Sequence, residues 1–186
     1  MGTNTADMAE TKAHLVEQLD WHWQHQLRPR LDGLTDDEYF WEPVPGCWTV
    51  HRDGGIDFAF PQPEPAPVTT IAWRLAHVIV GVLAMRAHSH FDGPPAAYET
   101  WSYATDAATA LRQLDEAYDA WMSGVRRLDA DDLDKPVGPA EGPWADHPML
   151  DLVLHINREV IHHGAEIALL RDLYIHSAHT PTSKEN

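Results

Sequence analysis

Four long segments of this chain repeat their apolar residues at helical spacing, and strand-like alternation is absent from the sequence. A repeat of three to four residues gives each segment one apolar stripe, which is stable only when it is buried against a neighbour. The pattern therefore predicts an all-α fold, a four-helix bundle. The segments run from about Asp7 to Leu31, from Thr69 or Thr70 to about His90, from Thr105 or Asp106 to about Leu128, and from an Asp146 cap, with Pro148 in the first turn, to about Tyr174.

A long Pro-rich loop is predicted between the first two helices. The capping-box pattern Thr35-Asp36-Asp37-Glu38 first predicts a short helix to about Phe40. Residues 43–67 then contain repeated Pro and Gly, including alternating prolines at 61–67, and these exclude a long helix. A connection of this length is usually functional. The aromatic residues of this loop would either cover the mouth of a pocket or only fix the loop to the bundle. These residues, together with the single cysteine, are Trp41, Cys47, Trp48, Phe58 and Phe60.

Composition limits the class of protein. The chain has 186 residues, 44% of them hydrophobic, which suits a single domain predicted at residues 1–175 with a polar tail at 176–186. A net charge of −16 argues against nucleic acid and against anionic membrane surfaces as partners. The longest apolar run, residues 78–85, is too short to span a bilayer. The polar N-terminus does not resemble a signal peptide, and the single cysteine, Cys47, fits a reducing compartment, so we expect a cytoplasmic protein.

Ionisable side chains are concentrated in the fourth segment, where His155, Glu159, His162, His163 and Glu166 fall within twelve residues. On a helix they form a stripe of about 100°, and Glu159 and His163 lie at its border with the apolar face. This stripe is either a solvent-exposed, titratable face or part of a metal site inside the bundle. The second interpretation requires a ligand from another helix.

His77 is the candidate for that ligand, because it interrupts the apolar stripe of the second segment. A lone histidine on such a face is more often a packed core residue than a ligand. Together with Glu159 and His163, however, it completes the two-histidine, one-carboxylate set that is usual for a catalytic first-row metal. The sequence thus predicts a metal site of His77, Glu159 and His163, with His162 as a neighbour that orients a ligand or shuttles protons and His155 as a reserve ligand.

Competing metal patterns are weaker. The sequence has no His-Glu-x-x-His motif, which disfavours a metalloprotease of that class. Glu159 and His162 form the Glu-x-x-His unit that di-iron bundles use twice, but a second copy is absent. The remaining candidates are not expected to bind a metal. His22 and His25 are expected to lie at the surface or to pack, His88 and His90 to face solvent at the end of the second helix, and Cys47 to be a plain buried thiol.

Three stretches resemble the DinB-like (damage-inducible) superfamily, and the resemblance covers roughly Leu15 to Tyr174. They are Trp73-Arg74-Leu75-Ala76-His77, Ile161-His162-His163-Gly164-Ala165-Glu166-Ile167 and Leu169-Leu170-Arg171-Asp172-Leu173. Members are four-helix bundles, often dimeric, that bind a divalent metal through three side chains, commonly three histidines. In this resemblance His77 and His163 match ligands of the family. Glu159 stands where the family has a histidine, which moves the set towards harder ions.

The resemblance implies a divalent metal, zinc first and nickel, iron or manganese as alternatives, and a homodimer. Related enzymes use mycothiol or bacillithiol, which implies a low-molecular-weight thiol cosubstrate here. We therefore expect a thiol-dependent S-transferase or isomerase, or a metal-assisted hydrolase, acting on a small electrophilic molecule. Trp48, Trp144 and Arg74 are candidates for its pocket wall, and packing would explain them equally well. The alternative is a metal-binding stress-response or ligand-binding module without turnover, because the sequence shows no nucleophile–base pair.

Overall fold

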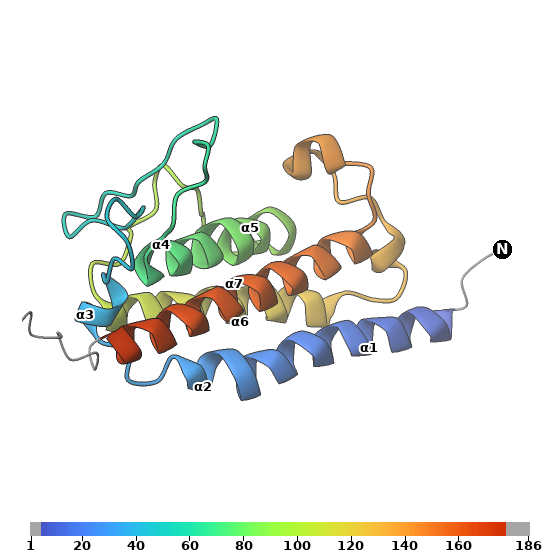
Figure 1. The fold of residues 1–186 in the computed structure, drawn as a ribbon. Coiled ribbons are helices and arrows are strands. Elements are labelled where there is room, and N and C mark those ends of the chain that lie inside the picture. Colours follow the sequence, from blue (N-terminus) through green and yellow to red (C-terminus); the bar gives the residue numbers. More distant parts are fainter. Residues whose placement is uncertain (1–4, 178–186) are drawn as a thin grey trace, which may run out of the picture.

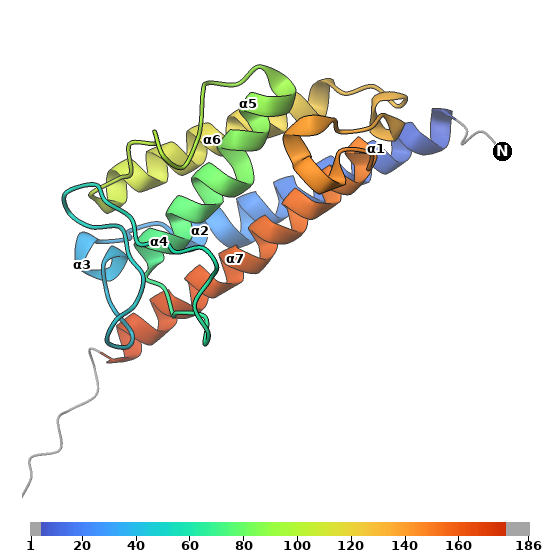
Figure 2. The ribbon, with the colours of Figure 1, turned by 90° about the horizontal axis from the view of Figure 1, so that it is seen from above.

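The structure, a computed structural model, describes residues 5–177, and within them four helical rods pack side by side (Figures 1 and 2). The rods are α1 (Thr5–His22) with η1 (Trp23–Leu27) and α2 (Arg28–Arg30); α4 (Ile71–Ala76) with η2 (His77–Ala84) and α5 (Met85–Phe91); α6 (Ala107–Arg127); and α7 (Met149–Ser177). Short helices lie in the connections, and they are α3 (Asp36–Tyr39), η3 (Asp132–Asp134) and η4 (Pro139–Trp144). The predicted all-α bundle is confirmed.

The directions of the rods determine which connection crosses the bundle. The α1 and α7 rods run one way, and α4–α5 and α6 run the other way (Figure 1). The chain therefore turns back at one end between α2 and α4, and at the opposite end between α6 and α7. Residues 92–106, by contrast, return along the length of the bundle from the end of α5 to the start of α6 (Figure 2). This crossover passes beside η2.

The second and third rods begin at side-chain caps, as the sequence predicted. The Thr70 hydroxyl accepts a hydrogen bond from the backbone N–H of Trp73 at 3.2 Å, and the Asp106 carboxylate accepts one from Thr109 at 2.7 Å. Such bonds satisfy backbone donors that have no partner within the helix. At its far end α5 is terminated by Asp92, which adopts the left-handed conformation at φ 56°.

The start of the fourth rod differs from the prediction. The helix begins at Met149 and is not capped by Asp146. The reason is backbone pairing with the preceding loop: Val137 N–H donates to the His147 carbonyl at 2.9 Å, and Met149 N–H donates to that of Lys135 at 2.8 Å. These bonds flank an isolated antiparallel bridge between Pro136 and Pro148, so helical geometry starts only at Met149.

Other boundaries agree with the sequence to within a few residues. Pro29 was expected to kink or end the first helix, and the rod ends at Arg30, just after the π-helical turn η1. The fourth rod continues to Ser177, past the predicted end at Tyr174. The predicted tail at 176–186 otherwise lies outside the described residues. Neither π-helical segment was predicted.

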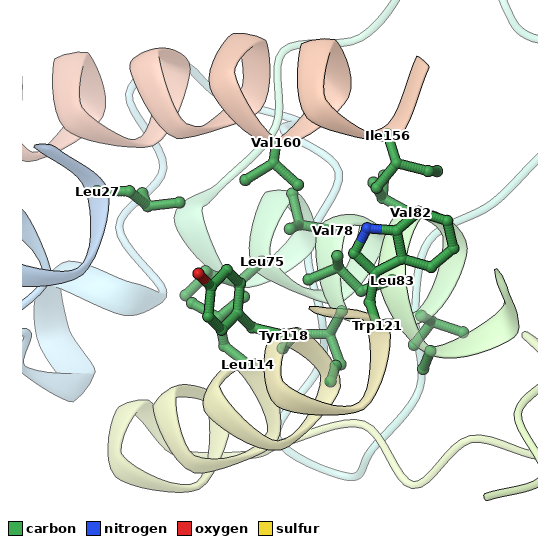
Figure 3. Packing of buried hydrophobic residues seen from close by; sticks show 14 of the residues in the cluster. Leu27, Leu75, Val78, Val82, Leu83, Leu114, Tyr118, Trp121, Ile156 and Val160 are labelled. Carbon is green, nitrogen blue, oxygen red and sulfur yellow. The ribbon is translucent and has the colours of Figure 1, made fainter. Parts of the chain in front are cut away.

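The core lies between α4–α5, α6 and α7. Figure 3 shows Trp121 of α6 beneath η2, with Ile156 and Val160 of α7 on the other side of that segment, and all three side chains are 0% exposed. The central position of the second rod explains its apolar composition. By length and composition alone Ile71–Phe91 could cross a membrane, but 67% of the tested window is buried inside the protein. Packing therefore accounts for its hydropathy.

The segment between α3 and α4 is anchored at both ends. Arg171 of α7 forms an ion pair with Glu38, whose side chain is 4% exposed, through two nitrogens. Near α4, Trp48 N–H donates to the Val68 carbonyl, and Thr70 N–H donates to the Trp48 carbonyl, both at 2.9 Å. Trp48 is therefore fixed beside the start of the second rod.

Candidate metal centre

The structure brings His77, Glu159 and His163 together at the crossing of η2 and α7. Their potential ligand atoms all lie within 4.8 Å of one another. His77 is the first residue of η2, while Glu159 and His163 are one helical turn apart on the facing side of α7. His163 Nε2 lies 3.3 Å from Glu159 Oε2, and the His77 and His163 rings are nearly perpendicular, with centroids 4.8 Å apart. Three donors from two rods thus converge on one point.

His163 supplies the strongest indication that this point suits a cation. Its side chain is 8% exposed, and Nδ1 lies 2.7 Å from Glu166 Oε2. Because a carboxylate only accepts hydrogen bonds, Nδ1 carries the proton. In the neutral ring Nε2 then has a free lone pair, and this atom is buried without a hydrogen-bond partner among the described residues. An unpaired buried nitrogen is costly, and a metal ion at the convergence point would satisfy it.

Arg74 lies on the other side of Glu166, and its positive charge stabilises the negative charge of the Glu166 carboxylate. Arg74 Nε is 3.0 Å from Glu166 Oε2, but its N–H is not aligned for a hydrogen bond. The contact is therefore an ion pair at close range. Burial lowers the pKa of Arg74, and the charge of Glu166 opposes that shift. Arg74, a candidate for the pocket wall, thus stabilises the carboxylate that orients His163.

His77 is held by a different partner. Its Nδ1 lies 3.2 Å from the hydroxyl of Tyr98, and its ring stacks on Trp73 at 5.6 Å with an interplanar angle of 14°. Burial, followed by repulsion from His163 and Arg74, lowers the pKa of His77 to about 4. The imidazole is therefore neutral at pH 7, which is the form that binds a metal.

Gly81 makes the Tyr98 contact sterically feasible. A Cβ at this position would lie 1.7 Å from the Tyr98 hydroxyl and 3.3 Å from His77 Nδ1. Only glycine leaves room for the tyrosine of the crossover to reach across η2. Sequence reasoning missed both residues. The available signal was the glycine itself, since glycine inside an apolar helix costs about 1 kcal/mol and often marks a close approach.

A second group of potential ligands shares His163. It consists of His162, His163 and Glu166. His162 is 62% exposed and its Nε2 lies 3.5 Å from Glu166 Oε1, so it adjoins the carboxylate that orients His163. The ion pair with Arg74 already neutralises Glu166, which makes this group the weaker candidate. His155 faces the outer oxygen of Glu159, with Nδ1 3.7 Å from Oε1.

The remaining candidates lie in different surroundings. Trp48 packs against Trp73 at 5.8 Å, and Phe58 stacks on Tyr98 at 6.4 Å, so two loop aromatics contact the residues that support His77. Phe60 is 91% exposed. Cys47 is buried, and its Sγ lies 3.0 Å from the Val44 carbonyl oxygen.

One expectation about the weaker histidines was wrong. His90 was expected to face solvent, but its side chain is 5% exposed, and Nε2 lies 2.9 Å from Glu141 Oε1. The connection that carries η4 folds back over the end of α5 and covers this histidine.

Comparison with known proteins agrees with the family resemblance seen in the sequence. A family model described as the DinB superfamily matches residues 18–167, a range that contains all three converging side chains. No curated protein and no solved structure matches the chain.

Proposed function

The chain belongs to the DinB superfamily, and on this premise we propose that it is a divalent-metal-dependent enzyme whose ion is held by His77, Glu159 and His163. The observation that carries this proposal is the buried, unpaired Nε2 of His163, directed at a carboxylate and a neutral imidazole. Zinc is the first choice, with nickel, iron and manganese as alternatives. Three protein ligands leave a coordination position open, as catalytic sites require.

A bound ion would supply a Lewis acid that lowers the pKa of a water or a thiol. The protein's own residues do the positioning: Glu166 and Tyr98 fix the two rings, and Trp73 shields His77 on one face. The reaction we propose is thiol transfer, isomerisation or hydrolysis on a small electrophile. The thiol would be a low-molecular-weight cosubstrate such as mycothiol or bacillithiol.

Metal content tests the site. We expect the purified protein to bind about one zinc per chain, and His163→Ala and Glu159→Gln to weaken this binding by at least about tenfold. His162→Ala, which changes an exposed neighbour on the same helix, is the matched control and should keep the affinity. If His162→Ala loses as much zinc as His163→Ala, the ion belongs to the second group of ligands instead.

Turnover requires a separate assay. Metal-loaded protein is mixed with mycothiol, bacillithiol or glutathione and a generic electrophile, and product formation is followed. A rate above that of free metal plus thiol, lost in His163→Ala, supports the enzyme. A rate no faster than this background, in protein that does bind metal, would favour the alternative of a binding module without turnover.

We also propose that the protein is a homodimer. The support is an apolar strip on the outer face of α7, where Leu169 is 59% exposed and Leu173, one turn later, is 46% exposed. Light scattering should give twice the 21.0 kDa chain mass, and a Leu169→Glu, Leu173→Glu variant should be monomeric. A wild-type mass of one chain would contradict this proposal. Cytoplasmic location and independence from nucleic acid and membranes stay predictions from the sequence.

A further inference from the structure

A cavity of about 490 Å³ lies beside the candidate metal centre, bordered by Arg86 of α5, the first turns of α7 and the connection that carries η4. In Figure 1 this connection stands above the N-terminal end of α7. Pockets for small molecules usually enclose roughly 300–1,000 Å³. The cavity is therefore large enough for a compact organic molecule.

The cavity and the three potential ligands share structural elements. His155 and Arg158, which line the cavity, lie 3.7 Å and 3.5 Å from Glu159 Oε1. Arg86, on another wall, donates to the backbone carbonyl of Gly81 in η2. A molecule in the cavity would therefore lie next to Glu159.

The cavity wall combines apolar surface with two arginines, of which Arg86 is paired with Glu141 at 3.4 Å. Its apolar part includes Trp144, which is 62% exposed, and Leu152. The two carboxylates of the wall are already paired, Glu141 with His90 at 2.9 Å and Asp151 with His147 at 3.1 Å.

Arg158 differs from these groups. Its side chain is 68% exposed, and the carboxylate next to it, at 3.5 Å, is Glu159. Glu159 also faces His163, where the proposed ion would share its charge. Nη2 of Arg158 also lies 2.6 Å from His155 Nδ1, so two of its three nitrogens face neighbours. Its Nη1 has no hydrogen-bond partner among the described residues, and this exposed donor is available to form a charge-assisted hydrogen bond with an incoming carboxylate.

We propose that this cavity binds a small carboxylate that has an apolar body, with the body against Trp144 and Leu152 and the carboxylate at Arg158. The binding itself is a property of the cavity. That the bound molecule is the substrate rests on the function proposed above, because only a metal at Glu159 would make this neighbourhood reactive.

Three probes with the same apolar body separate charge from hydrophobicity: 3-phenylpropionate, 3-phenylpropanamide and 3-phenylpropylamine. Each is titrated calorimetrically into metal-stripped and zinc-loaded protein. We expect the carboxylate to bind best to both forms. Arg158→Gln should weaken carboxylate binding by about tenfold and leave the amide unchanged. Trp144→Ala should weaken all three probes.

The control is Arg112→Gln, which removes the same charge from an exposed position on α6. An equal loss in Arg112→Gln would attribute the effect to net charge and overturn the proposal, as would equal affinity for the three probes. Carboxylate binding seen only in zinc-loaded protein, and unaffected by Arg158→Gln, would place the probe on the ion and also overturn it. Zinc affinity is measured on the same samples. Arg158-dependent binding in a protein that takes up no zinc supports the cavity while it contradicts the metal centre.

Discussion

The two histidines of the candidate centre are prepared in the same way, although their partners differ. Each ring uses Nδ1 for a hydrogen bond, His163 with Glu166 at 2.7 Å and His77 with Tyr98 at 3.2 Å. In both cases Nε2 is left for the point where Glu159 also converges. Partners of this kind fix ring orientation and tautomer, and losing one typically reduces metal affinity by about 10- to 100-fold.

Glu166→Gln tests the first of these partners. The amide oxygen can still accept the proton of His163 Nδ1, but the negative charge that makes the ring more basic and balances Arg74 is lost. We expect zinc affinity to fall by about tenfold or more, measured by competition with a chromophoric chelator. Glu116→Gln, an exposed change on α6, should have no effect. Unchanged affinity in Glu166→Gln would show that the carboxylate only neutralises Arg74.

Tyr98 and Gly81 form a second testable pair. Tyr98→Phe removes the partner of His77, and Gly81→Ala places a methyl group 1.7 Å from where the hydroxyl lies. Each change should weaken zinc binding by about tenfold. In a Tyr98→Ala background, Gly81→Ala should have little further effect, because the side chain that it displaces is absent. Additive losses in the double variant would mean that Gly81→Ala acts through the helix or through its contact with His77, 3.3 Å from Nδ1, and not through Tyr98.

The sequence predicted that three side chains converge, but it did not predict the residue that supports His77. His77, Glu159 and His163 could be placed because helical periodicity gives the direction of each side chain, and three polar groups bordered apolar stripes. Tyr98 could not be found in this way, since it lies in a crossover without periodicity. Its position depends on the direction of two rods and on a glycine in η2.

Among the elements, the four long helices were predictable because each buries one continuous apolar stripe and two of them start at clear caps. The start of α7 was not, because it depends on backbone hydrogen bonds to Lys135 and Val137, which lie in the preceding loop. The π-helical geometry of η2 could not be predicted from the spacing of apolar residues either. Such turns are frequent at functional sites, and here one begins at His77.

The connection that carries η4 is attached to α5 mainly through Glu141, and this attachment should depend on pH. The hydrogen bond from His90, followed by the charge of Arg86, lowers the pKa of Glu141 below its ordinary 4.5, against the effect of burial. A carboxylate whose folded-state pKa is lowered stabilises the protein above its unfolded-state pKa. That contribution is lost as the pH falls from 4.5 through the lower folded-state value.

We therefore expect Glu141→Gln to lower the free energy of unfolding by about 1.5–3 kcal/mol at pH 7. The difference between wild type and variant should shrink below pH 4.5. Urea unfolding at several pH values measures it, and Glu17→Gln, whose side chain in the wild type is 78% exposed, is the control. A difference that stays constant down to pH 3 would show that the interaction does not involve the charge of Glu141.

For the molecule as a whole, the candidate centre joins two rods that are far apart in sequence. His77 belongs to the second rod, and Glu159 and His163 belong to the fourth. An ion bound by all three should therefore stabilise the folded state, since the unfolded chain does not hold these groups together. The gain at a free zinc concentration of 1,000 times the dissociation constant is about 4 kcal/mol.

For a chain of this length that energy corresponds to a rise in melting temperature of roughly 8–16 °C. The measurement is a thermal melt of chelator-treated protein with and without zinc. His163→Ala should show a smaller rise, because a tenfold loss of affinity already reduces the gain to about 2.7 kcal/mol at the same zinc concentration. His162→Ala should keep the full rise. A rise of equal size in His163→Ala would mean that zinc stabilises the protein elsewhere, and the convergence of the three side chains would then have to be explained by packing alone.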